Sequence, residues 1–149
     1  METVDKQKAA RVWQRVQGQE PKQLDPNGLL ALIAGELADS ATYLQLSRRF
    51  QGQQSITLRK LYEQEQSHAA CLKGIYTLLT GERLISHTPT AFQEPLSATL
   101  RRCYGREMRS LKEYEARSGD PEYGHVFARL ADQERAHCRA VLELIGALR

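Results

Sequence analysis

The sequence predicts an all-α protein: a four-helix bundle of two antiparallel hairpins, with a long crossover between the second and third helices and a short N-terminal helix. Helical periodicity prevails, and no stretch sustains a period-two alternation of polar and apolar residues. The connections at Gly52–Gln54 and Ser118–Asp120 are short, and short connections force antiparallel neighbours. The middle connection of about a dozen residues can span about 40 Å, which matches the length of a helix of about 25 residues. The second and third helices can therefore run parallel.

The N-terminal region is predicted to be separate from the bundle. The stretch VDKQKAARVWQRV places its apolar residues on one side, as an amphipathic helix does. The following QGQEPKQ has the composition of a linker. We therefore assign residues 1–24 to an N-terminal helix and linker, and residues 25–149 to the four-helix bundle.

The first hairpin is predicted to begin at Asp25–Pro26. Asp can cap the unpaired N–H groups of a helix start, and Pro suits the first helical position. The first long helix is expected to run to about Phe50. The second is expected to begin after Ser55 and to run to about Gly81.

The second hairpin follows the crossover. The segment ERLISHTPTAFQEP shows no strong periodicity and contains two prolines. The third helix is expected to run from about Pro95 to Arg117 and to end at Gly119. Asp120–Pro121 repeats the cap-plus-proline start, and the fourth helix is expected to continue nearly to the C-terminus.

One phrase, acid-Gln-Glu-x-x-His, occurs twice in the chain. It reads EQEQSH at residues 63–68 and DQERAH at residues 132–137. Residues three apart lie on one face of a helix, so each phrase points a Glu and a His at the same spot. The first acid and the Gln lie off this face. The facing pairs are Glu65 with His68 and Glu134 with His137.

Each partner helix offers one more Glu at a similar height. Counted from the two short connections, Glu36 and Glu107 lie 17 and 12 residues back, and Glu65 and Glu134 lie 12 and 15 residues forward. These positions fall within about two helical turns of one level. Four buried carboxylates would repel one another, and two divalent cations would offset that cost. Mixed Glu and His donors suit iron or manganese, whereas an all-thiolate set would indicate structural zinc.

This arrangement resembles the ferritin-like di-iron carboxylate family, in which two helices each give a Glu and two each give Glu-x-x-His. The resemblance covers residues 26–148 and is closest to rubrerythrin-type domains. It implies two iron ions per chain, with manganese as the alternative, and Glu65 and Glu134 as bridging ligands. The metal ligands that it implies are Glu36, Glu65, His68, Glu107, Glu134 and His137.

Two tyrosines extend the resemblance. Tyr43 follows Glu36 by seven residues, and Tyr114 follows Glu107 by seven, so each lies two turns along on the same face. The family often has a Tyr in this relation, near the metals as a hydrogen-bond or redox partner. The resemblance thus implies a catalytic role for both, and simple core packing is the alternative.

The chain also departs from the family pattern. Rubrerythrins commonly carry another Glu three residues after the third-helix ligand, where this chain has Ser110. Asp39 stands instead three residues after Glu36. Asp39 could act as a seventh ligand, as an acceptor for a His N–H, or as an ordinary surface residue. The missing Glu weakens the case for peroxide reduction of the rubrerythrin type and leaves metal binding intact.

Charge gives no sign of a nucleic-acid or membrane surface. The net charge is only +3, and the basic residues are scattered. The run around Arg101, Arg102, Arg106 and Arg109 is expected to form one solvated or salt-bridged helix face. No apolar run approaches the roughly 20 residues of a membrane span, and the start has no signal-peptide core, so we expect a cytoplasmic protein.

The cysteines and the other histidines fit structural roles. Cys71, Cys103 and Cys138 include no C-x-x-C pair, which argues against a disulfide framework and against a rubredoxin-like module. Burial as packing residues is expected for Cys71 and Cys138, which each follow a His of a repeated phrase. His125 lies twelve residues before His137, about 18 Å along the helix, and is too far for the same site. His87 falls on the crossover and is expected to be exposed.

Three functions compete. The leading one is a di-iron oxidoreductase that reacts with peroxide or dioxygen and takes electrons from a separate donor protein. A ferroxidase or iron-handling protein is the second, although the chain ends at the foot of the fourth helix, where ferritins usually carry a fifth. The third is a non-catalytic bundle that serves as an interaction module, with a structural or vestigial metal site. A homodimer is expected, because the first helix with Trp13 could pack on a partner.

Overall fold

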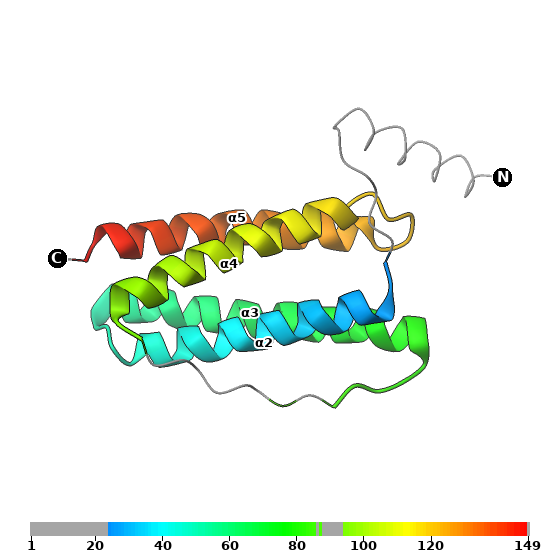
Figure 1. Ribbon diagram of the computed structural model, residues 1–149, viewed down its shortest axis with the longest axis horizontal. Coiled ribbons are helices and arrows are strands. Elements are labelled where there is room, and N and C mark those ends of the chain that lie inside the picture. The colour runs from blue at the N-terminus through cyan, green and yellow to red at the C-terminus, as the bar shows by residue number, and fades with distance from the viewer. Residues whose placement is uncertain (1–23, 86, 88–93, 149) are drawn as a thin grey trace. The chain divides into compact units, whose positions relative to one another are not determined.

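The computed structural model describes residues 24–85, 87 and 94–148 of the chain. Within these residues the chain forms four helices and no strand (Figure 1), which confirms the all-α prediction for this part of the protein. The helices are α2 (Pro26–Ser47), α3 (Gly52–Thr80), α4 (Leu96–Arg117) and α5 (Gly124–Gly146). The predicted N-terminal helix lies outside the described residues, so that assignment stays a prediction.

Helix α2 begins as predicted. The Asp25 carboxylate accepts a hydrogen bond of 2.6 Å from the N–H of Gly28, and Pro26 occupies the first turn. The helix ends at Ser47, three residues before Phe50, because its last turn tightens into i to i−3 hydrogen bonds.

Helix α3 begins earlier than the sequence predicts. Gly52 has a φ of 62°, and this left-handed backbone lets the chain reverse directly into the next helix. Ser55, the predicted start, lies inside the helix and donates its hydroxyl to the carbonyl oxygen of Ser47 at 2.7 Å. The end is as predicted, because Gly81 caps the helix with a φ of 73°.

Helices α2 and α3 form an antiparallel hairpin, as predicted. Ser55 contacts Ser47 near the turn, and further from the turn Gln66 Nε2 donates to the hydroxyl of Ser40 at 3.0 Å. The residue numbers of the partners move in opposite directions along the two helices, which is the mark of antiparallel packing.

The four helices fall into two compact units. One contains Asp25–Arg106 together with the chain from Arg139 on, and the other contains Glu107–Cys138. The boundary falls within α4 and within α5, so each of these helices contributes to both units.

The larger unit has a continuous apolar core. It is formed by Tyr43, Leu46, Leu58, Leu61, Leu100, Cys103, Val141 and Leu144. In this unit α2 and the first part of α4 run antiparallel, because Arg49 donates to the carbonyl oxygen of Glu94 and Arg106 pairs with Asp39. The start of α4 therefore runs in the same direction as α3 (Figure 1), as a crossover between them requires.

The smaller unit is a second antiparallel hairpin. The rings of Tyr114 on α4 and Phe127 on α5 have centroids 6.1 Å apart, and further from the turn Cys138 Sγ lies 3.6 Å from Met108 Sδ, so the partner numbers run in opposite directions. This arrangement confirms the second predicted hairpin.

The start of α5 differs from the prediction. The Asp120 carboxylate accepts hydrogen bonds from the N–H groups of Glu122 and Tyr123, at 3.1 and 2.7 Å, and so caps a turn rather than the helix itself. The helix begins at Gly124, where a Cβ would overlap the carbonyl oxygen of Ser118. Glycine is therefore required where the chain leaves the turn.

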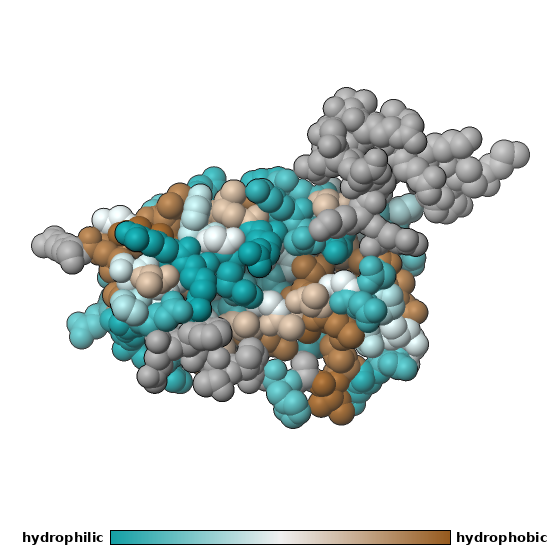
Figure 2. Space-filling view, viewed as in Figure 1, coloured by the Kyte–Doolittle hydropathy of each residue, from teal (hydrophilic) through white to brown (hydrophobic). Residues whose placement is uncertain are grey.

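The arginine-rich face of α4 is hydrophilic, as predicted. Arg101 and Arg109 are exposed, and Arg102 pairs with Glu94 at 2.8 Å. Figure 2 shows hydrophilic side chains along this helix. Among the described residues, no helix is long and apolar enough to cross a membrane.

Candidate metal centre

Three predicted ligands lie together on the first hairpin. Glu36 projects from α2, and Glu65 and His68 project from α3; each is at most 2 % exposed. His68 Nδ1 lies 3.5 Å from Glu36 Oε2. One donor atom from each of the three lies within 4.8 Å of the donor atoms of the other two. The hairpin thus gathers two carboxylates and one imidazole at a single buried point.

Packing on either side carries these polar side chains inward. On α3 the buried residues recur at spacings of three and four, in the order Leu58, Leu61, Glu65, His68 and Leu72. On α2 the same spacing runs through Leu29, Ile33, Glu36, Ser40 and Tyr43. Burying one leucine stabilises the fold by about 1.5–3 kcal/mol, so the flanking apolar residues offset the cost of placing acids inside.

The other three predicted ligands lie together on the second hairpin. Glu107 projects from α4, and Glu134 and His137 project from α5; each is at most 1 % exposed. His137 Nδ1 lies 3.4 Å from Glu107 Oε2 and 3.8 Å from Glu134 Oε2. One donor atom from each again lies within 4.8 Å of the other two.

The two groups have the same construction. In each, the first helix of a hairpin supplies one Glu, and the second supplies Glu-x-x-His. The distance from His Nδ1 to the single Glu is nearly the same, 3.5 Å in one group and 3.4 Å in the other. The repetition in the sequence therefore corresponds to a repetition in structure.

The donors fit a divalent metal ion in each group. Two carboxylates and one imidazole are hard and borderline donors, of the kind that iron and manganese accept. Buried carboxylates are costly without a compensating positive charge, and a bound cation would supply that charge.

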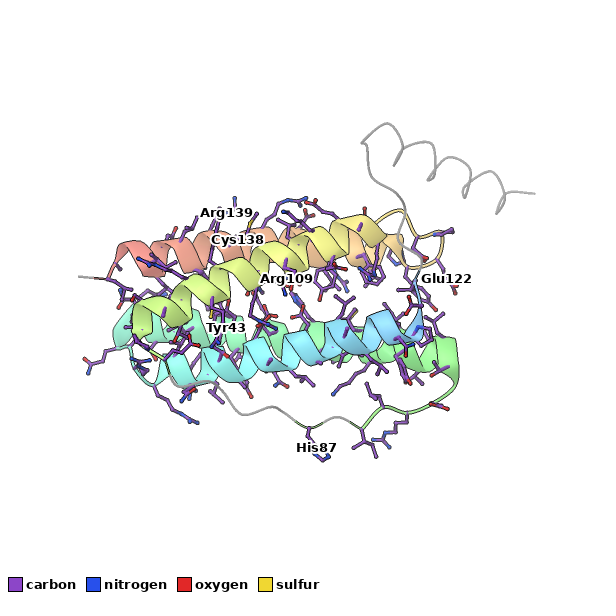
Figure 3. All side chains as sticks on the ribbon, in the orientation of Figure 1. Tyr43, His87, Arg109, Glu122, Cys138 and Arg139 are labelled. Atoms are coloured by element: carbon purple, nitrogen blue, oxygen red, sulfur yellow. The ribbon has the colours of Figure 1, made fainter. Side chains whose placement is uncertain are left out.

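Both predicted tyrosines are buried. Tyr43, 1 % exposed, belongs to the apolar core of the larger unit, and Tyr114 packs near Phe127 in the smaller one. Figure 3 marks Tyr43 on α2. A buried tyrosine can pack in the core or lie beside a metal, and burial alone does not distinguish the two. A catalytic role for Tyr43 and Tyr114 therefore stays a prediction.

Asp39 is not the surface residue that the sequence left as one option. It is 6 % exposed, and Arg106 Nε donates a hydrogen bond to its carboxylate. Arg106 Nη2 also donates to the carbonyl oxygen of Gly35 at 3.2 Å. Sequence reasoning treated Arg106 as part of a basic face and missed this partner. Arg106 directly precedes Glu107, and Asp39 lies one turn after Glu36. These two positions are the signal in the sequence that could have indicated the ion pair.

Cys138 and the remaining histidines lie as the sequence predicts, whereas Cys71 is less buried than expected. Cys103 and Cys138 are buried, and Cys71 is half-buried. Cys138 on α5 (Figure 3) lies with its Sγ 3.6 Å from Met108 Sδ. Burial, and then the charge of Glu107, raise the pKa of the Cys138 thiol and disfavour the reactive thiolate.

The two histidines outside the phrases are on the surface. His125 is exposed on α5, and His87 projects from the segment after α3, away from the helices (Figure 3).

Comparison with known families agrees with this geometry. The family model described as Rubrerythrin matches residues 28–145, which is more than half of the chain and contains all six predicted ligands. No curated protein and no solved structure matches the chain. The chain therefore belongs to the rubrerythrin family, whose domain is a ferritin-like four-helix bundle with an iron-binding carboxylate site.

Proposed function

We propose that this protein is a di-iron oxidoreductase that reduces peroxide, or reacts with dioxygen, using electrons from a separate donor protein. The observation that supports it most is the pair of buried groups, each with two Glu and one His, in a chain of the rubrerythrin family. Glu36, Glu65 and His68 would hold one iron, and Glu107, Glu134 and His137 the other.

Bridging by Glu65 and Glu134 is part of the proposal. Family membership supports it, because two helices of the ferritin-like di-iron proteins each supply Glu-x-x-His to one shared centre. A bridging carboxylate would share its negative charge between two cations and so lower the repulsion between them. Manganese is the alternative metal, because the same donors suit it.

Bound iron supplies the reversible electron transfer that reduction of an O–O bond requires. The chain's own residues supply binding and surroundings. The six ligands are at most 2 % exposed, so bulk water is excluded from them. Exclusion of water strengthens the attraction between the carboxylates and the cations.

Reduction of hydrogen peroxide to water takes up two electrons and two protons. In the proposal the phenol groups of Tyr43 and Tyr114 hold a proton or a hydrogen bond close to the reacting oxygen, as the family resemblance implies. Electrons come from outside the bundle, because none of the cysteines in this sequence has the C-x-x-C spacing of a rubredoxin-type centre.

The test compares two Glu-to-Gln variants on the same helix. Glu65→Gln removes a ligand charge, whereas Glu63→Gln changes an exposed acid of the same phrase. After anaerobic reconstitution with Fe(II), we expect wild type and Glu63→Gln to bind iron and to turn over hydrogen peroxide with a chemical reductant. Glu65→Gln should lose at least about tenfold in iron affinity, with turnover falling in parallel.

Two results would contradict the proposal. If Glu65→Gln kept the iron affinity and turnover of Glu63→Gln, the site assignment would be wrong. If loaded wild type showed no peroxide or dioxygen turnover but formed large particles that mineralise iron, the protein would be an iron-handling protein instead.

A further inference from the structure

An ion pair flanks the predicted ligand Glu36. Asp39 lies one turn after Glu36 on α2, and its carboxylate accepts a hydrogen bond from Nε of Arg106 on α4. Both residues belong to the larger compact unit. Neither the family match nor the predicted set of six ligands assigns them a role.

The second contact of Arg106 falls on the other side of Glu36. Its Nη2 donates to the carbonyl oxygen of Gly35 at 3.2 Å. The guanidinium group therefore binds the residue directly before Glu36 and the residue three positions after it. A planar group with several donors in a fixed geometry can hold two such acceptors at once.

The guanidinium of Arg106 packs against Gly35. A Cβ added at Gly35 would lie 3.4 Å from Arg106 Nη2, in direct contact with it. This is an ordinary van der Waals distance, so the contact places the guanidinium directly against this turn of α2.

Asp39 and Arg106 carry opposite charges. A guanidinium group stays protonated at any ordinary pH, and Arg106 Nε donates directly to the Asp39 carboxylate. Arg106 is thus firmly cationic, and its charge compensates the buried Asp39 carboxylate. Asp39 is also not among the residues whose donor atoms gather with those of Glu36 in the described part of the chain.

We propose that Asp39 is a positioning residue rather than a seventh metal ligand: with Arg106 it forms a clamp that holds the turn of α2 carrying Glu36. The inference rests on the proposed function, because fixing Glu36 matters only if Glu36 binds metal. Coordination by Asp39 would require breaking a charge-assisted hydrogen bond to Arg106. The clamp instead restricts the backbone on both sides of the ligand, so Glu36 keeps one orientation.

The test is a double-mutant cycle on metal binding. The variants are Asp39→Asn, Arg106→Met and the two combined, with Arg102→Met as the matched control. Arg102 lies one turn earlier on α4 and pairs with Glu94 at 2.8 Å. Co(II) serves as the probe, because its visible absorption bands report the ligands of the metal, and titration gives the affinity. Circular dichroism confirms that each variant is folded, and Arg106→Lys replaces Arg106→Met if the latter is not.

The clamp predicts coupled effects. Arg106→Met should lower the Co(II) affinity about tenfold or more, and Arg102→Met should leave it unchanged. Asp39→Asn should lower the affinity without moving the absorption bands. Once Arg106 is replaced, adding Asp39→Asn should cause no further loss.

A ligand role predicts a different pattern. Asp39→Asn would then shift the Co(II) bands and lower the affinity by the same factor in both backgrounds, and this result would overturn the clamp. Unchanged affinity in Arg106→Met would overturn it too, because the ion pair would then only stabilise the fold. In either case, Co(II) binding by wild type that depends on Glu65 would leave the proposed function standing.

Discussion

Burial divides each repeated phrase into two parts. In EQEQSH, Glu63 and Gln64 are exposed on α3, whereas Glu65 and His68 are buried. The i, i+3 spacing was enough to predict this division, because a helix fixes which residues share a face. The same rule predicts that Glu134 and His137 share a face of α5, and both are buried. At the scale of residues, the sequence was therefore enough to predict the burial of the six residues, whose role as metal ligands stays a prediction.

The partner of Asp39 was not accessible in this way. Arg106 belongs to another helix, and its surroundings on α4 suggested a solvated face. Which residue faces which across two helices depends on their relative rotation and height, and these follow from packing rather than from the periodicity of either helix. The sequence therefore offered several roles for Asp39 and could not choose among them.

The tyrosines allow a prediction at the same scale. Tyr43→Phe and Tyr114→Phe remove one hydroxyl each and should cost about 1 kcal/mol of stability or less. Iron binding should be unchanged, because a phenol is not among the ligands. Turnover of hydrogen peroxide by the loaded protein should fall, because the proton or hydrogen bond near the reacting oxygen is lost.

Tyr76→Phe is the matched control for this experiment, since Tyr76 is also buried but lies two turns beyond His68 on α3. Turnover is measured at saturating reductant for all three variants. Equal turnover in all of them would assign Tyr43 and Tyr114 to the core alone.

At the scale of elements, the existence and direction of the helices followed from the sequence, and their exact starts did not. Asp25–Pro26 and Asp120–Pro121 are the same signal, yet only the first begins a helix directly. At the second, the Asp120 carboxylate caps a preceding turn, and the chain passes close to Ser118 before the helix forms. A close approach of two backbone segments leaves no mark in the cap residues themselves.

Gly124 is expected to be essential for this start. Gly124→Ala should destabilise the protein by about 1–3 kcal/mol, because a Cβ there would overlap the Ser118 carbonyl and force the backbone to shift. Chemical denaturation of the metal-free protein measures the effect.

Gly105→Ala provides the contrast on α4. A Cβ at Gly105 meets nothing within 4 Å, so this change should stabilise the protein by about 1 kcal/mol through helix propensity alone. A Gly124→Ala variant as stable as Gly105→Ala would refute the role of the close approach.

At the scale of the whole molecule, two similar hairpins make up the described part of the chain. Each carries one Glu opposite a Glu-x-x-His phrase, and each buries the three together. A single phrase is weak evidence for a metal site, and the repetition is what made the prediction specific. The family match over residues 28–145 also supports a metal site, and it does not depend on the geometry of the two groups.

Partners belong to this scale and remain predictions. An external electron donor is expected because the cysteines form no C-x-x-C pair, and a homodimer is expected from the amphipathic N-terminal segment. Sequence patterns indicate such partners only by class, because recognition depends on surfaces that no short motif defines.

Metal stoichiometry tests the central claim most directly. Metal-free protein is titrated anaerobically with Fe(II), freed of unbound metal by gel filtration, and analysed for iron and protein. Two irons per chain in wild type, with a clear loss in Glu65→Gln, is the predicted result. Fewer than two irons per chain in folded wild type would contradict the assignment of a di-iron centre.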